Sequence, residues 1–297
     1  MELRVLRYFV ESARQESITK ASVRLHVTQP TLSRQIKDLE DELGQKLFIR
    51  TNYKIHLTPE GELLYKRAVD ILELADRTIQ DFAGMTEFAG GDVYVGCAES
   101  EGISIIARAA KRLHDQYPAF HLHVHSGNAE SVLERIDKGM LDFAVIVQEI
   151  DLTKYSSVVL PHKDIWGLIV PKNDKLAEKK EIHLDELENL PLILSRQSYS
   201  QEMPEWFKVN TDKLNVVATY NLAYNAGILV REGLGYALTL DHLVNTSCQS
   251  DLAFLPVTPE IASPMHLVYD RNHTFTKASR LFLDELKKII EEEKIRL

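Results

Sequence analysis

The sequence predicts a protein of several domains: a small N-terminal domain made mainly of helices, a long connecting helix, and a C-terminal α/β domain of two lobes. Three observations predict this arrangement. Short helical patterns, one of them opened by a proline, fill residues 1–58, and an unbroken helical pattern follows from Thr58 to about Glu87. From Asp92 onward strand and helix patterns alternate, which is typical of parallel sheets. The 297 residues are enough for two or three such units.

The composition is that of an ordinary globular chain, with 44% hydrophobic and 27% charged residues. No apolar run reaches the roughly 18 residues that a membrane span needs. The N-terminus carries charges through its apolar positions, unlike a signal peptide. We therefore expect a cytoplasmic protein with no membrane partner. Cys97 and Cys248 are expected as free thiols, with a single disulfide or a redox switch as the alternative.

The net charge of −9 is unevenly spread along the chain. Residues 1–86 carry as many basic as acidic side chains, so the whole acidic excess lies in residues 87–297. Within residues 17–54, the acids are confined to the stretch from Asp38 to Glu42, whereas Lys and Arg occur throughout. Local charge decides whether a surface can meet phosphates, so this region is the candidate for contact with nucleic acid.

Helical spacing predicts three helices in the N-terminal domain. The first covers residues 2–14, and Ser17 is placed to cap a short second helix that ends near His26. Thr28 is placed to cap the third. Pro30 is tolerated in its first turn, because the first amides of a helix have no internal partner. The buried stripe of this third helix is expected at Leu32, Ile36, Leu39 and Leu43.

The outward face of the third helix is predicted to read DNA. Two short helices joined by a tight turn, the second of them presenting polar side chains, form a helix-turn-helix. Such side chains can contact base edges in the major groove and grip the flanking phosphates. The alternative is an ordinary solvated surface. The residues expected to contact DNA from this helix are Thr28, Gln29, Pro30, Thr31, Ser33, Arg34 and Lys37.

A β-wing is predicted after Gly44. Ile55 and Leu57 alternate with polar neighbours, as in a strand, and residues 50–54 form a polar turn before them. The tip of the wing would carry Arg50, Tyr53 and Lys54 toward the DNA backbone or the minor groove.

Residues 17–62 resemble the N-terminal signature of LysR-type transcriptional regulators. The resemblance implies a winged helix-turn-helix that binds double-stranded promoter DNA. The wing departs from the family pattern, which usually has Gly where this chain has Asn52 and Arg where it has Tyr53. Arg50 or Lys54 would then substitute in the minor groove. The matching stretches are Ala21 with Leu25-His26-Val27, Thr28-Gln29-Pro30, Leu32-Ser33-Arg34-Gln35-Ile36, Leu39-Glu40, Leu43-Gly44, Leu47-Phe48, Arg50, and Leu57-Thr58 with Gly61.

Thr58, Pro59 and Glu60 predict the start of the connecting helix. Thirty helical residues span about 45 Å, which is too long for the small domain to cover its apolar stripe. We expect a second copy to cover it in a coiled coil, giving a homodimer; packing on the chain's own later domain is the alternative. Two-fold pairing would suit a palindromic DNA site. Residues 84–92 are expected to form a hinge. The stripe consists of Leu64, Ala68, Ile71, Ala75, Thr78 and Phe82.

The C-terminal part reads as βαβαβ followed by a second set of strands and helices. Crossovers near 161–163 and 264–267 would join two sheets and leave a cleft between them. Four stretches of this part match the effector domain of the same family: Gly127-Asn128 with Leu133, Gly139 with Leu141-Asp142, LIVPKNDKLA at 168–177, and Gly233-Leu234-Gly235. The resemblance implies a type II periplasmic-binding-protein-like fold, a small-molecule effector and a dimer-of-dimers tetramer. Strands are expected at 93–96, 120–125, 142–147, 166–170, 191–195, 209–219, 235–239, 252–257 and 265–270, and helices at 103–117, 129–140, 184–188, 221–232 and 275–294.

The expected domains are a DNA-binding domain at 1–58, a dimerisation helix and hinge at 59–90, and an effector-binding domain at 91–297. Lobe I of the last domain would hold 91–161 and 266–297, and lobe II 162–265.

Ligands of such clefts meet loops and helix starts at the carboxyl ends of strands. Helix N-termini there suit anions. Glu99 and Glu101, if they point inward, would repel a carboxylate effector and favour a cationic or polar one. The candidate effector-binding residues are Ser100, Glu101, Asn128, Ser198, Gln201 and Asn221, although each of the serine and asparagine candidates is equally suited to be an ordinary helix cap.

Neither an enzyme nor a cofactor is expected, because no catalytic or dinucleotide-binding motif occurs. His121, His123 and His125 share one face of a predicted strand. Steps of about 7 Å along that strand spread the imidazoles too far for a shared metal ion, so no metal is expected. Two alternative functions stay open: a solute-binding or ligand-sensing protein without promoter recognition, and an enzyme with a DNA-binding appendage.

Overall fold

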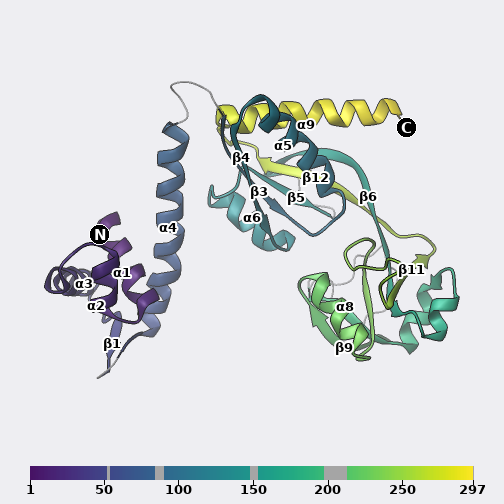
Figure 1. Ribbon diagram of the computed structural model, residues 1–297, viewed down its shortest axis with the longest axis horizontal. Coiled ribbons are helices and arrows are strands. Elements are labelled where there is room, and N and C mark those ends of the chain that lie inside the picture. The colour runs from purple at the N-terminus through teal and green to yellow at the C-terminus, as the bar shows by residue number, and fades with distance from the viewer. Residues whose placement is uncertain (52–53, 84–89, 148–152, 197–212, 297) are drawn as a thin grey trace. The chain divides into compact units, whose positions relative to one another are not determined.

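The computed structural model describes residues 1–51, 54–83, 90–147, 153–196 and 213–296 (Figure 1). The chain divides into two compact units, Met1–Ala83 and Gly84–Leu297. Within the described ranges, no helix combines the length and the apolar character that a bilayer span requires.

The first unit contains three short helices, a two-stranded wing and the long helix that follows. Phe9, Leu32 and Ile36 are buried at its centre. The wing strands pair antiparallel, with Phe48 opposite Leu57. The predicted order of elements is confirmed. The elements are α1 (Leu3–Gln15), α2 (Ile18–Arg24), α3 (Gln29–Leu43), β1 (Phe48–Arg50), β2 (Ile55–Leu57) and α4 (Pro59–Ala83).

The predicted buried stripe of α3 is correct at Leu32, Ile36 and Leu39 and wrong at Leu43, which is 40% exposed. The helix ends at Leu43, where Gly44 adopts a left-handed φ of 66° and reverses the chain, and Leu47 of the following segment is buried in the core instead. The inward position of this last turn is occupied by the carboxylate-bearing side chain of Glu40, which is buried.

Helix α4 is covered by its own domain over only part of its length. Ala68 and Leu72 are buried in the core of the first unit, where α4 packs on α1. Farther along, Ile79 and Phe82 are 66% and 68% exposed. The expectation that the small domain leaves the stripe uncovered is therefore correct for the second half of α4 and wrong for the first half. The described part of α4 reaches Ala83, and the predicted end near Glu87 falls in residues 84–89, outside the described ranges.

The second unit begins with a sheet whose strands β3, β4 and β5 are parallel, as the βαβαβ pattern predicts. Strand β12 and the first part of β6 extend this sheet antiparallel. Because side chains alternate along each strand, Phe143 faces α5 and α9 while Ala144 faces α6. The elements are β3 (Gly90–Cys97), α5 (Ile103–Gln116), β4 (Ala119–Ser126), α6 (Ala129–Asp137), β5 (Phe143–Ile146), β6 (Tyr155–Pro171), β12 (Ala262–Asp270) and α9 (Lys277–Arg296).

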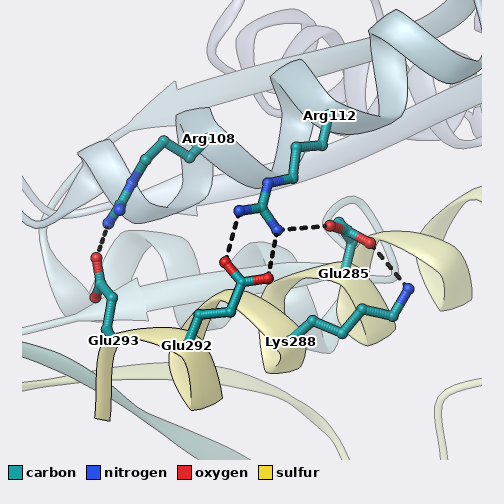
Figure 2. A network of polar contacts seen from close by, with 6 residues as sticks. All are labelled: Arg108, Arg112, Glu285, Lys288, Glu292 and Glu293. Carbon is teal, nitrogen blue, oxygen red and sulfur yellow. Dashed lines mark hydrogen bonds and ion pairs between the residues drawn. The ribbon is translucent and has the colours of Figure 1, made fainter. Parts of the chain in front are cut away.

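Helices α5 and α9 lie side by side and are joined by ion pairs at their outer surface (Figure 2). Arg112 of α5 binds Glu292 at 2.7 Å and Glu285 at 3.1 Å, and Arg108 pairs with Glu293. These carboxylates raise the pKa of Arg112. The pairs are largely exposed, so the apolar contacts beneath them contribute most of the stability of this layer.

A second sheet continues from the far part of β6. Strands β10 and β11 pair with β6 antiparallel, and β10, β8 and β9 run parallel. Helix α8 covers one face, around Ile169 and Ile193, and short 3₁₀ turns cover the other, around Leu168 and Leu192. The elements are η1 (Lys175–Glu178), β7 (Ile182–His183), η2 (Leu184–Asn189), β8 (Pro191–Ser195), β9 (Asn215–Tyr220), α8 (Ala223–Arg231), β10 (Tyr236–Leu240) and β11 (Leu252–Thr258).

Both lobes share the strands β6 and β12. The register between these strands shifts between Pro264 and Met265, where a crossover was predicted. Strand β6 begins at Tyr155, earlier than the predicted start at Trp166, because it runs through two environments and shows no single burial pattern. The predicted hinge is wrong for residues 90–92, which form the start of β3. Gly90 is needed there for close approach, since a Cβ would lie 2.1 Å from the carbonyl carbon of Ala119.

Candidate DNA-binding surface and effector-binding region

The turn between α2 and α3 places the start of α3 at the surface. His26 adopts a φ of 54°, and the amide of Val27 donates to the carbonyl of Ser22 at 3.0 Å. Thr28 then caps α3, as predicted: its Oγ1 accepts from the Thr31 amide at 3.4 Å and lies 2.8 Å from the Thr31 hydroxyl. Pro30 lies in the first turn. The two threonines therefore have a structural role at the cap, and they are exposed at the tip of the helix.

Five of the residues predicted to contact DNA line one concave surface, which encloses a volume of about 630 Å³. Arg34 is the most prominent of them: its side chain is 83% exposed, and its Nε lies 3.9 Å from the Asp38 carboxylate. An exposed pair at that distance is weak, so it does not prevent Arg34 from meeting a phosphate or a base. The five residues are Gln29, Pro30, Ser33, Arg34 and Lys37.

Sequence reasoning did not select three other residues of this surface: Glu40, Lys46 and Phe48. Glu40 accepts hydrogen bonds from the amides of Leu47 at 2.9 Å and Phe48 at 3.4 Å, and pairs with Lys46 at 2.7 Å. Burial alone would raise the pKa of Glu40, but these donors outweigh it and lower the pKa. A signal for Glu40 exists in the sequence, because it follows Ile36 by four residues and so falls on the inward face.

The wing is tied to the turn after α1. The amide of Ile55 donates to the carbonyl of Glu16 at 3.1 Å, and the Lys54 ammonium pairs with the Glu16 carboxylate. Lys54 lowers the pKa of Glu16. Lys54 is thus paired with an acid of its own domain. Of the other predicted wing residues, Tyr53 lies outside the described ranges and Arg50 is described by its backbone alone.

In the second unit, Ser100 is buried where the two lobes join. Its hydroxyl donates to the carboxylate of Asp164, with both oxygens at 2.8 Å, and accepts from the amide of Gly102 at 3.0 Å. His162 Nε2 lies 3.2 Å from the same carboxylate. Burial raises the pKa of Asp164. Sequence reasoning missed Asp164, because its strand carries no pattern that sets it apart from exposed neighbours.

Glu99 links the two lobes directly. Its Oε2 accepts from the amide of Ala223, the first residue of α8, at 2.9 Å. The prediction that Asn221 opens this helix is wrong: the cap position is Leu222, and the carboxylate from the other lobe takes the first amide. Glu99 therefore points toward the second lobe, whereas Glu101 is exposed.

Asn128 has the ordinary position of a helix cap. It caps α6, its Oδ1 accepting from the amide of Ser131 at 3.0 Å. Ser198 and Gln201 lie outside the described ranges.

The three strand histidines are exposed on β4. His123 lies 2.7 Å from Asp92 and stacks on Tyr94 at 4.5 Å between ring centroids, and His121 lies 3.8 Å from Asp92. Across the ranges that the structure describes, no three His, Cys, Asp or Glu side chains are arranged to hold a metal ion.

The two cysteines differ in environment. Cys97 is buried, and burial raises the pKa of its thiol to about 12, whereas Cys248 is exposed; both thiols are free.

A helix-turn-helix with an exposed second helix, followed by a two-lobed α/β unit, defines a DNA-binding regulator with an attached ligand-binding domain. Comparison with known families agrees. Residues 3–62 match the family described as bacterial regulatory helix-turn-helix protein, lysR family, and residues 87–290 match the LysR substrate binding domain. The chain belongs to the LysR family of transcriptional regulators. The members of this family are DNA-binding regulators with an effector-binding domain, rather than enzymes.

Relatives and solved structures extend over nearly the whole chain. The HTH-type transcriptional regulator BsdA of Bacillus subtilis is 29% identical over 288 residues, which cover 93% of this chain and 89% of that protein. A probable RuBisCO transcriptional regulator of Phaeodactylum tricornutum is 26% identical over 299 residues, covering 98% and 97%. Full-length CbnR in complex with its target DNA has the same fold, with a TM-score of 0.76 at 20% identity, covering 97% of this chain and all of that one.

Proposed function

We propose that this regulator reads its DNA site through the exposed face of α3, with the side chains of Gln29, Ser33 and Arg34 at base edges and Lys37 on a flanking phosphate. One observation carries the proposal: these residues and Pro30 line a single concave surface. Amide, hydroxyl and guanidinium groups are the donors and acceptors that major-groove recognition uses. Thr28 and Thr31 orient the helix start, and Arg50, Tyr53 and Lys54 contact the backbone or the minor groove from the wing.

The active form is a homodimer, assembled through α4, and two such dimers form the tetramer. The support is the apolar face that α4 leaves exposed on the first unit, which includes Ile71, Ile79 and Phe82. Covering this face with the same face of a second copy gives two-fold symmetry and two reading helices. The domain limits are 1–58, 59–89 and 90–297, with the second limit moved by one residue from the predicted 90/91 because β3 begins at Gly90. The protein acts in the cytoplasm, where its promoter DNA lies.

The effector binds between the two lobes, near Ser100. The support is the convergence of polar groups there: Ser100 and Asp164 at the junction, and Glu99 reaching the start of α8. With carboxylates on this side, we expect a cationic or polar effector rather than a dicarboxylate. Thermal-shift screening with matched cationic, neutral and dianionic compounds tests this expectation, and stabilisation by a dicarboxylate alone would contradict it.

The test of DNA reading begins by mapping the binding sites of the regulator across the genome. A duplex from one site and a scrambled duplex of equal length are then compared by fluorescence anisotropy. Arg34→Ala and Gln29→Ala are each expected to reduce the preference for the specific duplex by about five-fold or more, since each base contact is worth about 1–3 kcal/mol. Arg4→Ala, which removes an exposed cation on α1, is the control. Unchanged preference in both variants would refute the assignment of the reading helix.

A further inference from the structure

Lys46 lies outside α3, the helix proposed to read DNA, but it lines the same concave surface as the exposed residues of α3. Arg34 and Lys37 reach this surface from α3, and Lys46 reaches it from the segment between α3 and β1. Three cations from two separate segments thus border one hollow. The side chain of Lys46 is 69% exposed, while that of its partner Glu40 is 10% exposed, so the outer member of this pair is the cation.

The segment that carries Lys46 is held by α3 on one side. Glu40 of α3 accepts from the amides of Leu47 and Phe48 at 2.9 and 3.4 Å, and its other carboxylate oxygen lies 2.7 Å from the Lys46 ammonium. One buried carboxylate therefore anchors both the backbone of the segment and the lysine side chain. The left-handed φ of 66° at Gly44 allows the chain to turn back toward Glu40.

The same segment is held by the start of α4 on its other side. The hydroxyl of Thr58 donates to the carbonyl of Lys46 at 2.6 Å, and the amide of Thr58 donates to the carbonyl of Leu47 at 3.0 Å. A Cβ at Gly61 would lie 2.2 Å from the carbonyl oxygen of Leu47, so the two segments are in close contact. Lys46 is consequently presented from a backbone fixed between two helices.

We propose that Lys46 binds a backbone phosphate of the DNA duplex beside the groove that α3 enters, and that Glu40 is the residue that positions it. The inference rests on the DNA-reading function proposed above. A helix in the major groove lies between two phosphate backbones, so a cation bordering the same hollow, but displaced from the helix, faces one of them. A phosphate contact adds affinity without sequence preference, which separates the role of Lys46 from that of Arg34.

The test measures anisotropy of the full chain with the specific and the scrambled duplex over a range of salt concentrations. Lys46→Ala is expected to lower the affinity of the protein for both duplexes by the same factor. The logarithm of the association constant falls linearly with the logarithm of the salt concentration, and in Lys46→Ala this slope should become less negative by about 0.9, the value for one phosphate contact. Lys46→Arg should keep the slope. Lys111→Ala, which removes a similarly exposed lysine of the second unit, should leave both quantities unchanged.

An unchanged slope in Lys46→Ala, with wild type still preferring the specific duplex, overturns the phosphate contact alone. If wild type shows no preference between the duplexes, the proposed DNA reading itself fails. Thermal unfolding of each variant confirms that the comparison is made between folded proteins.

The positioning role of Glu40 is tested by a double-mutant cycle. Glu40→Gln keeps an acceptor for the two amides but removes the charge that holds Lys46. Glu40 is 10% exposed and holds the Lys46 ammonium from beneath, whereas Glu16, at 48%, lies exposed beside Lys54. Glu40→Gln should therefore weaken DNA binding several-fold when Lys46 is present and have little further effect in Lys46→Ala. Stronger binding by Glu40→Gln would mean that Glu40 competes with phosphate for Lys46, and it would refute the positioning role. An equal loss in both backgrounds would mean that Glu40 acts only through the shape of the wing, and the positioning role would be refuted.

Discussion

The carboxylate of Glu99 accepts a hydrogen bond at 2.9 Å from the backbone amide of Ala223, which belongs to the other lobe of the same unit. An acid in this position satisfies one of the free amides at the start of α8 and interacts favourably with the positive end of the helix dipole. The contact joins the two lobes next to Ser100, which itself donates to Asp164 of β6.

Loss of this contact is expected to loosen the start of α8. In Glu99→Ala the Ala223 amide loses its acceptor, and removal of a capping side chain typically costs about 1 kcal/mol. Hydrogen exchange at Ala223 and the next residues should accelerate about five-fold, while exchange in β3 stays unchanged. Glu101→Ala, a change at an exposed neighbour, is the control. Equal exchange at Ala223 in wild type and Glu99→Ala would show that the contact does not stabilise the helix start.

Asp164 is expected to make the stability of the second unit depend on pH. Burial raises its pKa in the folded state above the unfolded value, although Ser100 and His162 act in the opposite direction. A raised carboxyl pKa means that the folded state holds the proton more tightly. Stability is therefore greatest below the unfolded pKa and falls as pH rises to the folded pKa.

Asp164→Asn should remove this dependence. The melting temperature of Asp164→Asn minus that of wild type should be larger near neutral pH than under acidic conditions. Near neutral pH wild type must bury a charged carboxylate, whereas the amide is neutral at both pH values. Asp174→Asn provides a comparison at a less buried aspartate on the surface of the second lobe. A difference between Asp164→Asn and wild type that is the same at both pH values would contradict the expectation.

The pairing of Lys54 with Glu16 predicts opposite effects for the two residues on DNA affinity. Lys54→Ala should weaken binding to the specific and the scrambled duplex alike, because a contact with the DNA backbone carries no sequence information. Glu16→Gln removes the acid that competes with phosphate for Lys54, so it should strengthen binding to the scrambled duplex about three-fold at low salt. Anisotropy measures both changes, with Glu2→Gln as the control at another exposed acid. Weaker binding by Glu16→Gln would exclude this competition.

The exposed apolar side chains in the second half of α4 are expected to stabilise the proposed dimer. Ile79 and Phe82 are 66% and 68% exposed on the single chain, and burying each of them in a dimer would contribute about 1.5–3 kcal/mol. Phe82→Asp should raise the dimer dissociation constant at least tenfold, seen by sedimentation or light scattering over a concentration series. Lys66→Asp, which introduces the same charge at an exposed position nearer the start of the helix, should have a smaller effect. Equal association of wild type and Phe82→Asp would place the dimer contact elsewhere.

Local signals in the sequence were sufficient for the reading helix. Thr28 caps α3, Pro30 occupies its first turn, and Arg34 and Lys37 face outward, all as predicted. Each of these features depends on residues within a few positions of one another, because capping and helical periodicity are local effects. The parallel order of β3, β4 and β5 was likewise predictable, since the connecting helices require it.

The sequence by itself determined the order of the helices and strands and most of their buried faces, with exceptions such as Leu43 of α3 and the first half of β6. Only the tertiary structure decided that the Lys46 ammonium and the Leu47 amide both meet the Glu40 carboxylate, that Asp164 is buried under Ser100, and that Glu99 accepts from the first amide of α8. These polar groups are stable in the interior because each of them has a hydrogen-bond partner, and that partner comes from a different element of the chain. A buried polar group is tolerated only when such partners are present, and spacing along the chain carries no record of which remote backbone will supply them.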